Sequence, residues 1–330
     1  MKLLVTGGLG FIGSNFIIHV LKNYNDFEII NLDAEVDGSN HDNLKELEKS
    51  ERYRFVKGNI TNHKLMEELI NECDIVVNFA AESFVDKSIN DATPFLISNI
   101  MGTHTILDII TKQKKKLIQI STDEVYGSLK NDSATEKSVF NPTNPYAATK
   151  ASAELLINSY FATYNSNVII TRCTNNYGPR QFVEKLIPKT IILANQNKKI
   201  PIYGKGNNIR DWIFVDDHCD AILMSILNGK EGESYNISAN NEINNMTIVK
   251  KILQLMNKSE ELIEFVEDRP GHDFRYSLDS TKITKELGWK INTTFDEGIK
   301  NTVQWYLENP DILNNISSTV LDPTPWKSSN

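Results

Sequence analysis

Cysteine is scarce in this chain of 330 residues, which holds only Cys73, Cys173 and Cys219. An odd number of widely spaced cysteines without a CxxC pair argues against a disulfide framework and against a zinc site. Long apolar runs are missing as well, since none approaches the length of a membrane-spanning helix. The opening MKLLVTGG is too short for a signal-peptide core and indicates a first strand. We therefore expect a cytoplasmic protein with no bound metal and no membrane partner.

Positive charge is the third deficit, because 35 lysines and arginines face 43 aspartates and glutamates, for a net charge of −8. Proteins that bind nucleic acid over a broad surface need clustered cations to neutralise the phosphates. The one basic run, KQKKKL at 112–117, is short and is more simply explained as a solvated helix end. We expect no nucleic-acid partner, although this charge is compatible with one small anionic ligand in a local site.

Strand and helix patterns alternate through the first half of the chain. Short runs rich in Val, Ile and Leu predict strands, and amphipathic segments between them predict helices, among them 11–23, 63–72, 95–112 and a long helix from Pro145. Strands that are apolar throughout indicate a parallel sheet covered on both faces. The predicted fold class is α/β, with a doubly wound parallel (Rossmann) sheet and a smaller, mixed α/β substrate-binding domain.

The pattern loosens after Gly178, where loops lengthen and glycine and proline recur. The later segments DDHCDAILMSIL and ESYNIS nevertheless predict a helix and a strand that return to the first sheet. We therefore expect two interleaved domains. Residues 1–177 plus about 212–238 would form the Rossmann domain, and about 178–211 plus 239–330 would form the substrate domain.

A glycine-rich loop follows the first strand in TGGLGFIGSNF, with Gly7, Gly10 and Gly13 at intervals of three. Such a loop permits a tight turn and brings the backbone and a helix N-terminus close to a pyrophosphate. Asp33 ends the second strand twenty residues after Gly13, where a carboxylate binds the ribose hydroxyls of NAD. Loop, strand, helix and acid in this register predict a dinucleotide-binding site. Two further acids follow closely and could share the role of Asp33, namely Glu35 and Asp37.

Two other strand ends contribute small or polar residues to the same edge of the predicted sheet. Asn59, in GNI, offers an amide to an adenine edge, although a simple turn explains it equally well. Ala80 and Ala81, in FAAES, either let a ligand approach the backbone or reflect tight strand packing.

The segment NPYAATKASAELL begins a helix at Pro145, with Tyr146 and Lys150 one turn apart on the same face. An ammonium near a phenol favours the phenolate, so we expect Lys150 to lower the pKa of Tyr146 from about 10 toward neutrality. Tyr146 would then be a base for a sugar or alcohol hydroxyl. This spacing is common by chance in surface helices, and it gains meaning from the dinucleotide site that precedes it.

One further stretch, STDEVYG, places Thr122, Asp123 and Glu124 at the end of a predicted strand. Together with TGGLGFIG and YAATK, it resembles the extended short-chain dehydrogenase/reductase family and, more narrowly, the nucleotide-sugar 4,6-dehydratases. The likeness runs from Met1 to about Glu308 and includes AAESFVDKSI, NNYGPRQFVEKLIP, PIYGKGNNIRDWIFVDDH and DRPGHDFRY. The plainer alternative is that the two adjacent acids only cap a turn.

The resemblance implies a hydro-lyase that converts dTDP-glucose to its 4-keto-6-deoxy product by internal hydride transfer through tightly bound NAD. Tyr146, beside Lys150, would take the proton of the 4-hydroxyl, and Thr122 would hydrogen-bond the same oxygen. Glu124 would remove the proton from carbon 5, and a protonated Asp123 would donate to the departing 6-hydroxyl. A deoxysugar pathway of the rhamnose type is the expected context.

The resemblance also assigns binding residues. The cofactor would contact the glycine loop and several strand ends, at Gly7, Gly10, Phe11, Ile12, Gly13, Asp33, Asn59, Ile60, Ala80, Ala81, Ser98, Tyr146, Lys150 and Asn176. The sugar nucleotide would contact Ser83, Thr122, Asn175, Lys185, Leu186, Pro201, Ile202, Tyr203, Arg210, Asn245, Arg269 and His272. The cations for its diphosphate would come from this second group, at Arg210, Arg269 and His272 beside Lys185.

Four positions depart from the family's pattern. Phe84 stands where histidine is expected, Asn59 stands where aspartate is expected, and Arg180 and Phe182 also replace other residue types. A phenylalanine cannot hydrogen-bond, so any polar contact at position 84 is lost. These changes bear on the details of the site more than on the reaction.

Two alternatives stay open. A UDP-sugar 4-epimerase or a UDP-glucuronate decarboxylase of the same family begins with the same oxidation at carbon 4 but does not need an acid–base pair at carbons 5 and 6. A non-catalytic nucleotide-binding protein would have no need of Thr122, Tyr146 and Lys150. Thymidine and uridine differ by one methyl group, a contact worth only about 1–3 kcal/mol, so the base stays open as well.

The resemblance implies a homodimer. The predicted helices near 95–112 and 145–164 carry apolar and aromatic positions that could form a four-helix interface between two copies of the chain. Ordinary burial of these positions on the sheet is the alternative.

Overall fold

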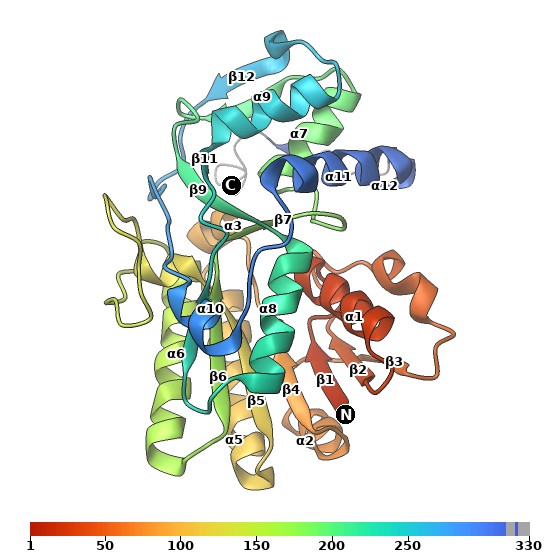
Figure 1. Ribbon diagram of the computed structural model, residues 1–330, viewed down its shortest axis with the longest axis vertical. Coiled ribbons are helices and arrows are strands. Elements are labelled where there is room, and N and C mark those ends of the chain that lie inside the picture. Colours follow the sequence, from red (N-terminus) through yellow and green to blue (C-terminus); the bar gives the residue numbers. More distant parts are fainter. Residues whose placement is uncertain (315–320, 323–330) are drawn as a thin grey trace.

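A seven-stranded parallel sheet forms the larger part of the protein, whose computed structural model is described here for residues 1–314 and 321–322 (Figure 1). Its strands lie in the order β10-β6-β5-β4-β1-β2-β3. Their bounds are β1 Lys2–Thr6, β2 Glu28–Asp33, β3 Tyr53–Lys57, β4 Ile75–Asn78, β5 Lys116–Thr122, β6 Val168–Cys173 and β10 Ser234–Ile237. The strand order reverses between β1 and β4, and ligands of such sheets bind at the carboxyl ends beside this switch point. The predicted fold class is confirmed.

Helices cover both faces of this sheet. One face carries α1 (Phe11–Asn23), α8 (Val215–Asn228) and α10 (Thr281–Leu287), whose apolar side chains meet those of β1 and β6 in one core cluster. The other face carries α2 (His63–Glu72), α5 (Thr103–Gln113) and α6 (Pro145–Tyr164), which pack around Leu4, Ile30 and Val76. The helices predicted at 11–23 and 63–72 have those bounds in the structure.

The predicted helix at 95–112 is a continuous helical segment that contains a π-helical stretch. It consists of α4 (Thr93–Phe95), the π-helical segment η2 (Leu96–Gly102) and α5. The π-helical turn carries Asn99, whose Oδ1 accepts from the backbone N of Glu82 at 2.9 Å. The Nδ2 of Asn99 donates to the Thr149 hydroxyl at 2.9 Å. Asn99 therefore joins the loop after β4 to α6, which is a typical use of a π-helical turn at a functional site.

The remaining elements form a smaller region of mixed sheet and helix, at the top of Figure 1. A three-stranded sheet has the order β11-β9-β7, and a two-stranded parallel sheet pairs β12 with β8. The bounds here are β7 Asn175–Tyr177, α7 Leu186–Asn195, β8 Ile200–Tyr203, β9 Ile209–Phe214, β11 Glu242–Asn244, α9 Asn245–Leu255, β12 Ile263–Val266, α11 Phe295–Glu308 and α12 Pro310–Asn314. Tyr177, Trp212 and Tyr306 are buried in the core of this region.

The shorter helices lie in the loops. They are η1 His41–Leu47, α3 Val85–Asn90, η3 Asp123–Tyr126 and η4 Glu260–Leu262. In the described part of the chain, every helix is too short or too polar to cross a lipid bilayer.

The division into two interleaved domains stays a prediction. Within about 212–238, α8 packs on the large sheet and β10 pairs with β6. However, α10 also packs on the large sheet, although it lies in the range predicted for the substrate domain. The last part of that range, 315–320 and 323–330, lies outside the described residues.

Candidate active site

Two adjoining cavities open at the carboxyl ends of the parallel strands. The large cavity, of about 610 Å³, is lined by the glycine loop and by the ends of β2 to β6. The small cavity, of about 190 Å³, is lined by α3, α7, β8, β9 and the loop at 269–272. The two share four lining residues, Asn175, Asn176, Gln181 and Lys185. A ligand can therefore extend from one cavity into the other.

The predicted site residues all line one of these cavities. The large cavity brings together Gly7, Gly10, Phe11, Ile12, Gly13, Asp33, Asn59, Ile60, Ala80, Ala81, Ser83, Ser98, Thr122, Asp123, Glu124, Tyr146, Lys150, Asn175, Asn176 and Lys185. The small cavity brings together Asn175, Lys185, Leu186, Pro201, Ile202, Tyr203, Arg210, Asn245, Arg269 and His272. Their positions fit the predicted roles, which are taken up below as a proposal.

The glycine loop needs its glycines because the backbone is crowded there. Gly7 has φ +71°, and a Cβ at this position would lie 2.7 Å from the backbone N of Ala80. A Cβ at Gly13 would lie 2.5 Å from the carbonyl oxygen of Gly7. The helix α1 begins after Gly10 without a side-chain cap and without an acidic residue in its first turn. Its N-terminal N–H groups are thus available to an anion at the large cavity.

Asp33 is held rigidly at the end of β2. Its Oδ2 accepts from the backbone N of Leu9 at 2.9 Å, and its Oδ1 accepts from the Ser39 hydroxyl at 2.7 Å. Glu35 does not line either cavity and forms ion pairs with Lys57 and His41. Asp37 lines the large cavity, but its carboxylate pairs with Lys87 at 2.6 Å. Asp33 therefore fits the ribose role better than the other two acids.

Asn59 and Ala80 each combine the two roles that the sequence left open. The Oδ1 of Asn59 accepts from the backbone N and the hydroxyl of Thr61, both at 2.9 Å, so it does form a turn. Asn59 also lines the large cavity. Ala80 packs tightly against Gly7 and lines the same cavity.

The expected effect of Lys150 on Tyr146 is wrong for the chain taken by itself. Burial raises the pKa of Tyr146, and the negative charge of Glu124 raises it further, whereas the neighbouring Thr122 hydroxyl lowers it. Lys150 turns its ammonium to the carbonyl of Ile120, at 2.7 Å. Burial lowers the pKa of Lys150 to about 8, so this cation is itself weakened. Tyr146 needs a further positive charge nearby to become a phenolate.

The two adjacent acids lie in unlike environments. Asp123 is buried, and burial together with the charge of Glu124 raises its pKa to about 8. Its Oδ1 accepts from the Thr122 hydroxyl at 3.1 Å, whereas its Oδ2 is buried and lacks a hydrogen-bond partner among the described residues. A neutral carboxyl with one free oxygen can hold a proton there for transfer.

Glu124 is half-buried and accepts hydrogen bonds through one oxygen. Its Oε2 accepts from Nδ2 of Asn144 at 3.2 Å. The Tyr276 hydroxyl is 3.5 Å from the same oxygen and donates to Oδ2 of Asp273 at 2.6 Å. Asn144 also caps α6, since its Oδ1 accepts from the backbone N of Ala147. The helix that carries Tyr146 and Lys150 thus begins at a residue that orients Glu124.

The small cavity contains buried cations. Arg210 is 5 % exposed, donates to the backbone carbonyl of Asp273 at 2.9 Å and stacks over the ring of Tyr276 at 4.3 Å. The side chain of Arg269 is 16 % exposed. His272 does not fit its predicted role as a cation. Burial and the neighbouring Arg269 lower the pKa of His272 to about 4, so its imidazole is neutral near pH 7.

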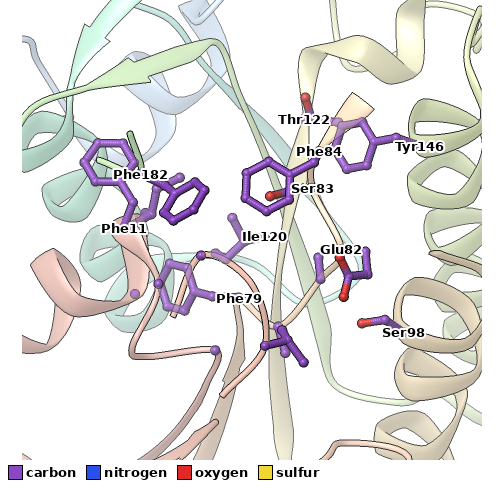
Figure 2. A pocket seen from close by; sticks show the side chains of 18 of the residues that line it. Phe11, Phe79, Glu82, Ser83, Phe84, Ser98, Ile120, Thr122, Tyr146 and Phe182 are labelled. Carbon is purple, nitrogen blue, oxygen red and sulfur yellow. The ribbon is translucent and has the colours of Figure 1, made fainter. Parts of the chain in front are cut away.

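An aromatic pair is the main feature of the large cavity that the sequence did not predict. Figure 2 shows the Phe84 ring turned toward that of Phe182, and their centroids are 5.3 Å apart. The ammonium groups of Lys87 and Lys185 lie over the Phe84 ring at 4.8 and 4.9 Å. Phe84 thus replaces the expected polar contact by ring and cation–π contacts. The sequence showed the departure at both positions but not that the two rings meet.

Some residues that line the cavities could not be predicted from the sequence, because no motif indicates their role. His218, on α8, is fully buried, and its Nδ1 lies 2.9 Å from Oδ1 of Asn176. Burial lowers the pKa of His218 to about 3, so it is a neutral group that orients the Asn176 amide. Lys189 and Asp86 line the small cavity and were likewise not singled out.

The comparisons with known proteins agree with this site. A family model described as GDP-mannose 4,6 dehydratase matches residues 4–302, so the chain belongs to this family. The low-salt glycan biosynthesis protein of Haloferax volcanii is 46% identical over 93% of this chain and 99% of its own length. The dTDP-glucose 4,6-dehydratase of Salmonella typhimurium is 41% identical over 96% of each chain. The resemblance to nucleotide-sugar 4,6-dehydratases is confirmed.

Solved structures show the same fold. The dTDP-glucose 4,6-dehydratase of Bacillus anthracis in complex with NAD is 45% identical, with a TM-score of 0.89 over 94% of this chain and 98% of that one. A UDP-glucuronic acid 4-epimerase of Bacillus cereus has the same TM-score at 27% identity, over 94% of this chain and 100% of that one. The fold alone therefore does not separate a dehydratase from an epimerase.

Proposed function

We propose that the protein catalyses the 4,6-dehydration of dTDP-glucose to the 4-keto-6-deoxy sugar nucleotide. The observation that carries this proposal is the Asp123–Glu124 pair at the end of β5. One acid is buried with its pKa raised to about 8, and the other is half-buried beside Tyr146. Elimination of water across two neighbouring carbons needs one group that gives a proton and one that takes it.

The large cavity fits NAD. The carboxylate of Asp33 would hold the adenosine ribose, and the glycine loop with the N-terminus of α1 would hold the pyrophosphate. When bound, NAD supplies a hydride acceptor for carbon 4, a hydride donor for carbon 6, and a cationic ring. Its solved relative from Bacillus anthracis binds NAD in the same fold, which supports this assignment.

Tyr146 would take the proton of the 4-hydroxyl. A positive charge in the large cavity would oppose the charge of Glu124, which now raises the pKa of the phenol. The Thr122 hydroxyl, which neighbours Tyr146, would hydrogen-bond the same substrate oxygen. Lys150, fixed to the Ile120 carbonyl, would keep a further cation within the buried site.

Glu124 and Asp123 would then divide the elimination between them. The carboxylate of Glu124, oriented by Asn144, would take the proton from carbon 5. Asp123 would donate its proton from Oδ2 to the departing 6-hydroxyl, which leaves as water. As carbon 6 is reduced, Glu124 would return its proton to carbon 5. The proton that Tyr146 took from the 4-hydroxyl equals the one that Asp123 gave to the departing water, so the overall proton count balances.

An epimerase is the weaker alternative. The fold likeness to the Bacillus cereus epimerase is as high as that to the dehydratase. An epimerase has no elimination step, however, and would gain nothing from a buried protonated Asp123 beside Glu124. The acid pair therefore favours the dehydratase.

A homodimer belongs to the same proposal. Large apolar side chains are exposed on two neighbouring helices, at Leu96, Ile97 and Met101 of η2 and at Leu155 and Tyr164 of α6. η2 packs against α6, and exposed large apolar side chains on neighbouring helices are typical of surfaces that a second copy covers. Light scattering after size exclusion tests this, and a Leu155→Glu variant should shift the mass toward one chain. A cytoplasmic location and a deoxysugar pathway complete the proposal.

Product analysis tests the proposed reaction. Purified protein is incubated with dTDP-glucose, and in parallel with UDP-glucose, without added reductant or oxidant. The proposal expects a product lighter than dTDP-glucose by one water, with UDP-glucose turned over more slowly. A product of unchanged mass with inverted carbon 4 would show an epimerase instead.

A further inference from the structure

Asp86 is a carboxylate in a cavity that should attract anions. It lies in the first turn of α3, lines the small cavity, and its side chain is 10 % exposed. The same cavity is lined by four cationic side chains, at Lys185, Lys189, Arg210 and Arg269. A negative charge at this position repels a diphosphate, so its presence needs a physical reason.

Both oxygens of Asp86 are turned to protein donors. Its Oδ1 accepts from Nη1 of Arg269 at 2.9 Å. The Tyr203 hydroxyl lies 3.5 Å from its Oδ2. Asp86 comes from the loop region after β4, whereas Arg269 follows β12, so the ion pair joins the two walls of the small cavity.

The other edge of Arg269 is left for a ligand. An arginine donates along one edge through Nε and Nη2, while Nη1 lies on the far side. The Nε of Arg269 is buried and has no hydrogen-bond partner among the described residues. A buried N–H without a partner costs free energy unless a ligand accepts from it. The Nε–Nη2 edge matches two oxygens of a phosphate.

We propose that Asp86 is a positioning residue, which holds Arg269 by Nη1 so that its Nε–Nη2 edge receives the diphosphate of the nucleotide. The inference rests on the proposed function for the identity of this ligand. Asp86 itself does not touch the diphosphate. The sign of its effect separates this role from a purely electrostatic one. Without a positioning role, removal of the negative charge would tighten the binding of an anion.

Titration calorimetry tests the inference without turnover, with dTDP, UDP and GDP as probes on the NAD-containing protein. Asp86→Ala should weaken diphosphate binding by about tenfold or more, the value of a charge-assisted hydrogen bond. Asp86→Asn keeps an acceptor oxygen and should lose less. The matched control is Glu264→Gln, which removes the same charge from an exposed residue of β12 outside both cavities. Binding in the control should change less than twofold.

A double variant closes the test. In an Arg269→Ala background, Asp86→Ala should no longer weaken binding, because the group that it positions is gone. Unchanged or tighter diphosphate binding in Asp86→Ala alone would overturn the inference. If Asp86→Ala does not fold, Asp86→Asn is used instead: weaker diphosphate binding supports the inference, and unchanged or tighter binding overturns it. A wild-type protein that binds UDP or GDP in place of dTDP overturns the proposed substrate, while the comparison of variants still decides the role of Asp86.

Discussion

The large and the small cavity are built in different ways. The large cavity lies at the ends of neighbouring parallel strands, beside the glycine loop, where a Cβ on Gly7 would lie only 2.7 Å from the backbone N of Ala80. The small cavity combines charged side chains from α3, α7, β9 and the loop at 269–272 with apolar ones such as Leu186 and Trp212. Strand ends are fixed by the sheet, whereas the charge and direction of a long side chain depend on its tertiary neighbours. The shape of the large cavity is therefore set by the sheet, whereas the binding properties of the small cavity depend on how its positive and negative side chains pair.

Of the variants considered, Tyr146→Phe should lower turnover most. Binding in the small cavity should stay unchanged. The ring keeps its packing against Val85 and Phe95, while the hydroxyl that accepts the substrate proton is lost. Loss of a general base lowers turnover by about 10²–10⁴-fold. Steady-state assay with dTDP-glucose measures this, and calorimetry with dTDP should give an unchanged affinity. A large loss of dTDP affinity would show that Tyr146 serves binding rather than chemistry.

Asp33→Asn should weaken NAD binding in the large cavity. The new amide would place an N–H group against the N–H of Leu9, now bound to Oδ2 at 2.9 Å, and would also lose the charge that attracts ribose hydroxyls. We expect NAD binding to weaken by about tenfold or more, as measured by the NAD content after gel filtration. The control is Glu35→Gln, since Glu35 is paired with Lys57 and His41 outside the cavity. Equal losses in both variants would show that the two acids share the ribose.

The titration of Asp123 should make the free energy of unfolding depend on pH, which is a smaller effect than the two above. Its folded pKa is about 8, whereas an unfolded aspartate ionises near pH 4. The unfolded chain thus binds fewer protons between these values, and stability falls as pH rises from about 4 to about 8. Asp123→Asn removes this titration. The free energy of unfolding of the wild type, relative to this variant, should fall by an amount on the order of a few kcal/mol over that range.

Denaturant unfolding at several pH values measures this difference. A difference that rises with pH would show that Asp123 is ionised in the folded protein, and its role as a proton donor would be lost. The same titration predicts that turnover of the wild type falls above about pH 8, where Asp123 loses its proton.

The sequence predicted where residues lie better than how they are charged. The glycine loop, Asp33 and the Tyr146–Lys150 pair were found because their spacing is set by strand and helix geometry, and each lines the expected cavity. The pKa of Tyr146 and the charge of His272 were predicted wrongly, since both depend on burial and on residues distant in sequence. Asp86 was inside a recognised segment, but its partner Arg269 is 183 residues away.

The contact between Phe84 and Phe182 also depends on residues that are distant in sequence, so it could not be predicted from the sequence. Both are unusual residues for the family, but only the structure shows that the two rings are 5.3 Å apart and that two ammonium groups lie over the Phe84 ring. A sequence gives no direct sign of such a pair, because one ring follows β4 and the other follows β7. The π-helical turn that places Asn99 against Glu82 was equally hidden within a plain helical pattern.

The most direct test of the central claim is a single turnover of Glu124→Gln with dTDP-glucose in deuterated water. The claim is that Tyr146 serves the oxidation at carbon 4, while Glu124 serves the elimination with Asp123. In this variant NADH absorbance should still form but decay slowly, and deuterium should enter carbon 5 far more slowly than in the wild type. Loss of NADH formation in the same proportion as deuterium uptake would contradict this division of roles, because Glu124 would then act on both steps or on neither.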